Sequence, residues 1–159
     1  MAKGRSRHAR RAVAGLTTFA LGFALTATTV GAASSAPGHA ANSAAVNEDA
    51  HLRFKRSSGP ELYEEGRTTG SLSGMMHAWL HASSTFSGSF VLYTRLGQIR
   101  GHGIATPHGS GRYQSFSGTT YITGGTGRYV HARGTGGLYG VFDRRTFAVL
   151  LQTRGRFSY

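Results

Sequence analysis

Apolar and polar residues alternate with a period of two through the C-terminal part of the chain. This alternation is typical of strands with one buried and one solvated face in an antiparallel sheet. No stretch after residue 66 shows a useful apolar period of 3.6 residues, so the pattern predicts an all-β domain over residues 67–159. The predicted inward sides of the four clearest runs are Met76, Ala78 and Leu80; Phe86, Gly88, Phe90 and Leu92; Phe116, Gly118, Thr120 and Ile122; and Phe147, Val149, Leu151, Thr153, Gly155 and Phe157.

Turn-forming residues separate these runs at a spacing that fits about eight short strands, in either a sandwich or a closed barrel. Glycine inside the strands favours the barrel, because small barrels coil their strands strongly and glycine relieves crowding at the bends. Closure also removes the exposed sheet edges that promote aggregation. We therefore predict a small antiparallel β-barrel. The glycines that favour it are Gly88, Gly101, Gly103, Gly118, Gly140 and Gly155.

The first 40 residues have the layout of a secretory signal peptide. Basic residues precede an apolar run from Ala12 to about Gly31, and small residues follow it. We expect residues 1–40 to be removed and the protein to be secreted, with an N-terminal membrane anchor as the alternative. The chain has no cysteine, so an exported domain would depend on its core rather than on disulfides.

Residues 41–66 differ from the rest of the chain because they hold five of its six acids. We interpret this segment as a loosely ordered linker that precedes the barrel domain. Its apolar side chains are expected to dock on that domain; they are Leu52, Phe54, Leu62 and Tyr63.

The charge of the predicted domain points to anionic partners. The chain has a formal net charge of +12, and after Gly66 it has no lysine and a single acid, Asp143. Such a balance predicts affinity for anionic polymers such as cell-wall polymers, although a signal peptide argues against nucleic acid. The alternative is that the charge only keeps an exported protein soluble. The arginines expected to form one basic face are Arg100, Arg112, Arg144, Arg145, Arg154 and Arg156.

The glycine-rich segment 124–136, GGTGRYVHARGTG, raises the question of a phosphate-binding loop. The predicted domain has no lysine for a Walker loop, and no G-x-G-x-x-G pattern followed by a helix occurs. A pair of catalytic carboxylates is missing after Gly66, and no G-x-S-x-G elbow is present. The histidines of HAWLH, His77 and His81, would lie roughly 13 Å apart on a strand. We therefore predict no metal and no cofactor, and we interpret the segment as a turn.

The same segment resembles the G-G-T-G-x-aromatic-x-x-A-R-G motif of the dirigent and allene oxide cyclase barrel superfamily. The preceding FSGTTYIT is similar to the strand that leads into that motif. The resemblance implies an eight-stranded antiparallel barrel with a central apolar cavity, and dimers or trimers, so a homo-oligomer is a further expectation. It also implies acidic residues in the pocket, and the predicted domain offers only Asp143. The identities are Gly124, Gly125, Thr126, Gly127, Tyr129, Ala132, Arg133 and Gly134.

Three functions remain open from the sequence. The first is binding of a small apolar or aromatic ligand inside the barrel, because aromatic residues are abundant and ligand pockets are mostly apolar. The second is a cyclase, isomerase or coupling-guiding activity of the superfamily kind, and the third is binding of an anionic wall polymer through arginine. Arg133 either bonds loop carbonyls or lines the mouth of the pocket. The candidate ligand-binding residues are Tyr93, Phe116, Tyr121, Arg133 and Tyr139.

Overall fold

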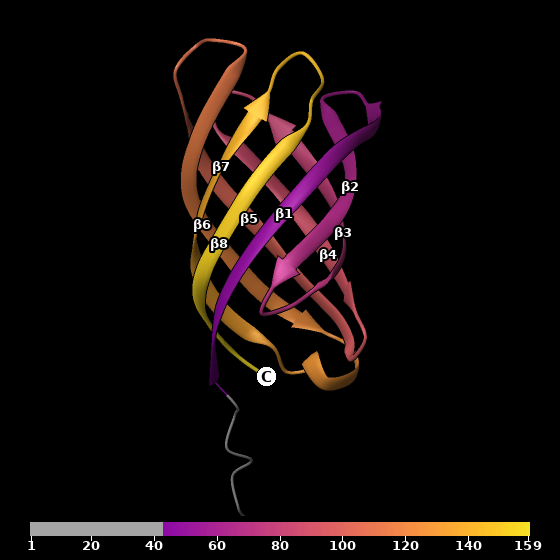
Figure 1. Ribbon diagram of the computed structural model, residues 1–159. Helices are drawn as coiled ribbons and strands as arrows, with labels where there is room; N and C mark the ends of the chain where they lie inside the picture. The colour runs from indigo at the N-terminus through magenta and orange to yellow at the C-terminus, as the bar shows by residue number, and fades with distance from the viewer. Residues whose placement is uncertain (1–42) are drawn as a thin grey trace, which may run out of the picture. The chain divides into compact units, whose positions relative to one another are not determined.

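A computed structural model describes residues 43–159, so the predicted signal peptide and residues 41–42 lie outside the described part. Eight antiparallel strands form a closed barrel in which each strand pairs with its neighbours in sequence and β8 pairs with β1 (Figure 1). The strands are β1 (Ser43–Ser58), β2 (Glu61–Gly70), β3 (Gly74–Ala82), β4 (Phe86–Thr94), β5 (Gly97–His108), β6 (Tyr113–Gly125), β7 (Arg133–Asp143) and β8 (Val149–Ser158).

The prediction of an all-β antiparallel barrel of about eight strands is confirmed. A single turn of 3-10 helix, η1 (Gly127–Tyr129), lies between β6 and β7. Within residues 43–159, no helix has the length and apolar character needed to cross a membrane. We call the end of the barrel that carries the β1–β2, β5–β6 and β7–β8 turns the upper end, and the end that carries η1 the lower end (Figure 1).

The interpretation of residues 41–66 as a linker is wrong. Residues 43–58 form β1, the longest strand, and residues 61–70 form β2. Both are integral to the barrel, since β1 pairs along its length with β2 and β8. The domain therefore begins with β1 rather than at residue 67. Of the apolar side chains expected to dock, Leu52 and Leu62 are buried inside the barrel, whereas Tyr63 lies on its outer face among other rings.

The predicted inward residues do face the barrel interior. Leu92, Phe116, Ile122, Val149 and Phe157 are among the buried side chains, and they join the buried residues of β1 and β2 in one core. Phe147 is the exception within its run, because it lies in the β7–β8 turn with a φ of 58° and is 39 % exposed.

Several inward positions are occupied by a glycine whose directly opposite partner is a phenylalanine. An ideal Cβ built on such a glycine would meet an atom of the aromatic ring at 2.3 to 2.7 Å, far closer than van der Waals contact. The glycine thus provides the space that the ring fills, an arrangement known to support glycine in strongly curved sheets. The three pairs are Phe90 with Gly101, Phe116 with Gly140, and Phe157 with Gly134.

The glycine-rich segment forms the turn between β6 and β7, as predicted. Gly124 and Gly127 have φ values of 154° and 59°, which are conformations that favour glycine. Tyr129 is buried under the turn with 5 % exposure. The Arg133 guanidinium donates to the carbonyl of Ala132 at 2.7 Å, which supports the structural role considered for this arginine.

Hydrogen bonds join this turn to the β4–β5 hairpin. The Thr126 N–H donates to the Gln98 carbonyl at 2.9 Å, and the Gln98 N–H donates to Thr126 Oγ1 at 3.0 Å. The Arg128 N–H donates to the Leu96 carbonyl at 2.9 Å. The backbone amides near η1 are thus used to close the lower end of the barrel, which is a structural rather than a phosphate-binding role.

We predict that Gly140→Ala destabilises the barrel by about 1–3 kcal/mol or more, because overpacking forces the strands or the ring to move. The added Cβ would lie 2.3 Å from the Phe116 ring and 2.3 Å from the Leu150 carbonyl oxygen. Gly111→Ala in the β5–β6 turn is the matched control, since no atom lies within 4 Å of its new Cβ. Urea unfolding compares the two variants. Equal midpoints would show that the glycine–phenylalanine fit is not needed.

Candidate functional site

The barrel encloses an apolar cavity with a volume of about 110 Å³. Every strand except β2 contributes lining residues, so the cavity occupies the axis of the barrel rather than a gap in its wall. The inward small residues Ala78, Gly103 and Ala105 leave this space because no longer side chain projects there. Larger apolar side chains that line the cavity include Met76, Leu92, Ile99, Phe116, Leu138 and Leu151.

The cavity is long, and exposed residues line it at one end. Its lining residues on β3 extend from Met76 to Ala82, which is roughly 20 Å along a strand. At the upper end, the lining includes His81 and Ala82, which are exposed, and we call this end the mouth. At the lower end, the lining is formed by Leu72 and the buried side chain of Glu48.

Glu48 is the acidic residue of the cavity lining. On β1 it lies opposite Gly70 of β2 and Thr153 of β8, and its side chain is 5 % exposed. One carboxyl oxygen, Oε1, accepts a hydrogen bond from the Leu72 N–H, whereas Oε2 is buried and has no partner among the described residues. Burial raises the pKa of Glu48 to about 7, although hydrogen bonds from the backbone of Leu72 and Ser71 oppose this rise.

The segment between β2 and β3 closes the cavity below Glu48. The Thr68 hydroxyl donates to the Leu72 carbonyl at 3.0 Å. The Ser71 N–H donates to the Asn47 carbonyl at 3.2 Å, and the Asn47 N–H donates to Ser71 Oγ at 3.1 Å. These bonds, together with the Glu48–Leu72 bond, fasten the segment to β1 and hold Leu72 against the cavity.

A second carboxyl, that of Glu64, is also inside the barrel. It projects from β2 between Phe54 of β1 and Ala78 of β3, and it has no exposed surface. Neither of its oxygens has a hydrogen-bond partner among the described residues, and burial raises its pKa to about 8. Gly70, the partner of Glu48 on β2, is six residues from Glu64 along that strand. This spacing places the two carboxyls roughly 20 Å apart, which is too far for a catalytic carboxylate pair.

Sequence reasoning missed both interior acids because it placed them in a linker. The resemblance implied acidic residues in the pocket, and Asp143 was the sole candidate in the predicted domain. In the structure, Glu48 rather than Asp143 supplies an acid to the cavity. The sequence did contain a signal, namely the period of two in β1. Val46, Ala50 and Leu52 occupy inward positions of this period, and Glu48 occupies the inward position between Val46 and Ala50.

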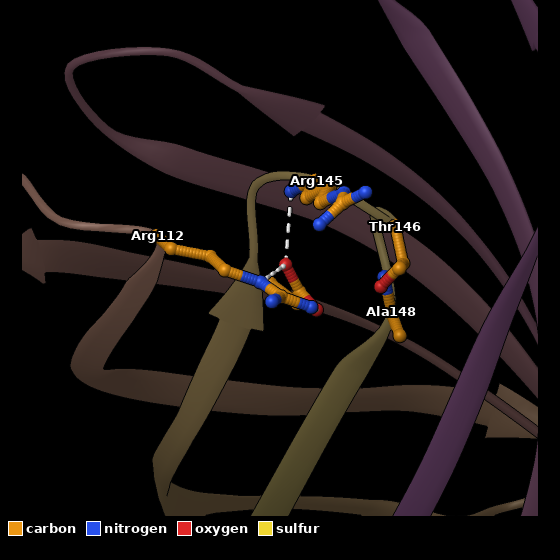
Figure 2. Close-up of polar contacts among 5 residues, drawn as sticks. Arg112, Arg145, Thr146 and Ala148 are labelled. Atoms are coloured by element: carbon orange, nitrogen blue, oxygen red, sulfur yellow. Dashed lines mark hydrogen bonds and ion pairs between the residues drawn. The ribbon is translucent and has the colours of Figure 1, made fainter.

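Asp143 has a structural role at the upper end. Its carboxylate accepts two hydrogen bonds from the Arg112 guanidinium, at 3.1 and 2.9 Å, and a third from the Arg145 N–H at 2.9 Å (Figure 2). These hydrogen bonds, above all the two from Arg112, hold the pKa of Asp143 well below its usual range. Asp143 thus joins the β5–β6 and β7–β8 turns and contributes nothing to the cavity lining.

One of the five predicted ligand-binding residues lines the cavity, namely Phe116. The other four do not, and their expected place inside the barrel is corrected. Tyr93, Tyr121 and Tyr139 are 39 %, 37 % and 51 % exposed, because they occupy outward positions of their strands. Arg133 starts β7 at the lower end with its guanidinium on the turn, away from the mouth.

The six arginines expected to form one basic face are all exposed, but they fall into separate places. Arg112, Arg144 and Arg145 surround the upper turns, and Arg112 is paired with Asp143. Arg154 and Arg156 lie on the outer face of β8, and Arg154 is about 17 Å along the strand from its upper end. Arg100 lies on β5, which β6 and β7 separate from β8. Since screening acts over about 8 Å at physiological salt, these groups would act largely independently. Polymer binding stays a prediction.

Aromatic rings gather on the outer face of β2, β3 and β4. The Tyr63 ring lies 5.4 Å from Trp79 and 5.9 Å from His77, and His77 lies 4.8 Å from Tyr93. The Tyr63 hydroxyl is 3.1 Å from His77 Nδ1. The single tryptophan therefore lies outside the barrel, so its fluorescence is a poor reporter of the cavity. In residues 43–159, no three histidine, aspartate or glutamate side chains group as metal ligands would.

We predict that the free energy of unfolding falls as the pH rises from about 5 to about 8. Glu48 and Glu64 have raised pKa values of about 7 and 8 in the folded protein, so folding retains protons that the unfolded chain releases above about 4.5. Their stabilising contribution is complete below the unfolded pKa and is lost as the pH passes the folded one. Each group contributes a slope of about 1.4 kcal/mol per pH unit between its two values.

Urea unfolding at several pH values measures this slope. Glu64→Met, which keeps the unbranched shape, should reduce the slope and stabilise the protein at pH 8. Glu61→Gln, which removes a carboxyl that is 39 % exposed, is the control and should keep the slope. An unchanged slope in Glu64→Met would contradict the burial of this carboxyl.

Comparison with known proteins returned no match. No family model, curated protein or solved structure matches this chain. The cavity and its residues are therefore the basis for a proposed function.

Proposed function

We propose that this protein binds a small, largely apolar molecule in the cavity of its barrel. The observation that carries the proposal is an internal space of about 110 Å³ lined almost entirely by apolar side chains, with a mouth at one end. An engineered apolar cavity of about 150 Å³ in another protein stays dry and binds benzene, so a space of this order takes a small ligand. A single acid at the closed end supplies the polar group that fixes orientation in such pockets.

The energetics of packing support this proposal. Side chains that face an empty space lose dispersion contacts, and such a cavity destabilises a folded protein. A ligand of matching size restores those contacts. The cavity of this barrel is created by inward small residues, such as Ala78, Gly103 and Ala105.

The wider context of the proposal comes from the sequence. The signal-peptide layout of residues 1–40 supports an exported binding protein. The resemblance of residues 124–134 to the dirigent and allene oxide cyclase superfamily implies an eight-stranded barrel with an apolar cavity, and both features occur here. These two arguments agree with ligand binding, and neither assigns a ligand.

A second candidate function is cyclisation or isomerisation of a ligand in the same cavity. One observation favours it, namely that Glu48 lines the cavity and has a pKa of about 7, near the ideal value for a general acid or base. The test is to incubate a candidate ligand with the protein and to look by chromatography for a new product of unchanged mass, which is an isomer. Formation of that product by the parent protein, but not by Glu48→Gln, would assign this function. Ligand recovered unchanged would leave binding alone.

We predict that small apolar compounds such as hexan-1-ol or toluene raise the melting temperature. A ligand at 100 times its Kd stabilises the folded state by about 2.7 kcal/mol. Gly103→Val should abolish the shift, because the new side chain fills part of the cavity, where the nearest obstacle is the movable Leu138 side chain at 3.0 Å. Differential scanning calorimetry provides the measurement.

The control is Ile104→Val on the same strand, because Ile104 is 50 % exposed on the outer face. This variant should keep the full ligand-induced shift. Loss of the shift in both variants, or no shift in the parent protein across the series, would overturn the proposed function.

A further inference from the structure

The closed end of the cavity presents one acid and one hydroxyl side by side. Glu48 of β1 and Thr153 of β8 are directly opposite each other, both line the cavity, and they are 5 % and 9 % exposed. The described structure shows no hydrogen bond of the Thr153 hydroxyl and none to Glu48 Oε2. The lining residues near them include the apolar Met76, Ile122 and Phe157, and also Thr120, whose hydroxyl lies 3.5 Å from the His102 carbonyl oxygen.

A buried carboxyl with one oxygen that lacks a hydrogen-bond partner destabilises the folded protein. An unsatisfied buried acceptor costs about 1–3 kcal/mol, and more when it is charged. Because the terminal torsion of a glutamate is broad, a small rotation can turn the free oxygen toward a ligand while Oε1 keeps the Leu72 N–H. A ligand that brings a hydrogen-bond donor to this point would remove the cost.

We propose that the cavity selects a small linear alkyl amine, with its nitrogen on Glu48 and Thr153 and its alkyl chain directed toward the mouth. The inference rests on the proposed function, since it names the class of ligand for the same cavity. The long, narrow lining from Met76 to Ala82 suits an unbranched chain. A primary alkyl amine is an ammonium at neutral pH, as a lysine side chain is. It enters as the ammonium, a protonated Glu48 carboxyl loses its O–H proton to the solvent, and an ammonium–carboxylate pair forms.

Charge distinguishes an amine from other ligands with the same apolar chain. An ammonium has three donors, so it can reach the Glu48 carboxylate and the Thr153 hydroxyl together and compensate the buried charge. An alcohol offers one donor and no charge. A carboxylate would place a second acid beside Glu48, where like charges repel.

The protonation of Glu48 fits this exchange. Burial raises the pKa of Glu48 to about 7, so at neutral pH about half of the Glu48 carboxyls are already ionised and can pair with an ammonium, and the rest need to release only one proton. The groups that face it from neighbouring elements are Gly70, Leu72 and Thr153, none of which carries a charge. Asp49 is the adjacent charged residue on β1, and His81 is the other titratable residue of the lining, at the mouth.

Calorimetric titration with hexan-1-amine, hexan-1-ol and hexanoate at pH 7 tests the inference in the full folded protein. We expect the amine to bind at least tenfold more tightly than the alcohol, and the hexanoate to bind least. In Glu48→Gln the advantage of the amine over the alcohol should disappear. The control Glu64→Gln should keep it, because Glu64 is outside the cavity lining.

The outcomes separate the two proposals. If hexan-1-ol binds and the amine binds no better, the inference is overturned while the proposed function stands. If none of the three compounds binds, the proposed function fails and the inference fails with it. If Glu48→Gln does not fold, the ratio of amine to alcohol affinity in the parent protein still tests the inference.

The second measurement is the carbon-13 chemical shift of the Glu48 carboxyl. It should move to its ionised value when the amine is added, but not when the alcohol is added.

Discussion

Pairing between the first and the last strand is the interaction on which the rest of this structure depends. The register of β1 and β8 extends from Ser43 opposite Ser158 to Leu52 opposite Val149, and it converts a curved sheet into a closed barrel. Without this seam both strands would be edges with unpaired backbone groups. The β1–β8 pairing also places Glu48 next to Thr153, so the same pairing closes the barrel and forms the polar end of its cavity.

The curvature of the barrel and its internal space arise from the same choice of residues. An eight-stranded barrel has an interior just wide enough for side chains to fill. Here inward glycines let neighbouring strands and phenylalanine rings approach closely, as for Gly140 beneath Phe116. Where no ring covers an inward glycine, as at Gly103, the axis of the barrel stays open. A cavity is therefore a consequence of how this chain bends its strands.

Much of the fold could be predicted, because inward apolar residues recur with a clear period of two in β3, β4, β6 and β8. The failure lay in β1 and β2, where the inward series of β2 reads Leu62, Glu64, Gly66 and Thr68. Two of these side chains are polar and one is absent, so the alternation is hidden. Acids are rarely buried without a partner, and their abundance in residues 41–66 indicated a solvated linker instead.

The site could be predicted less well than the fold, for a related reason. Aromatic character suggested the tyrosines as pocket residues, although the alternation already placed Tyr93 on the side opposite Leu92. The side-chain period was the stronger constraint, and it assigned the tyrosines to the outer face. The period of two in β1 could place Glu48 on the inward side, but its position next to Thr153 comes from the pairing of β1 with β8, more than 100 residues apart in the sequence.

Two carboxyls of the N-terminal strands lie inside the barrel, and one of them, that of Glu48, lies at the end of its cavity. Carbon-13 NMR titration of the glutamate side-chain carboxyls in the folded protein tests this most directly. We expect Glu48 and Glu64 to titrate at about 7 and about 8. Titration of both near 4.5, the value of an exposed glutamate, would show instead that β1 and β2 do not bury their acids.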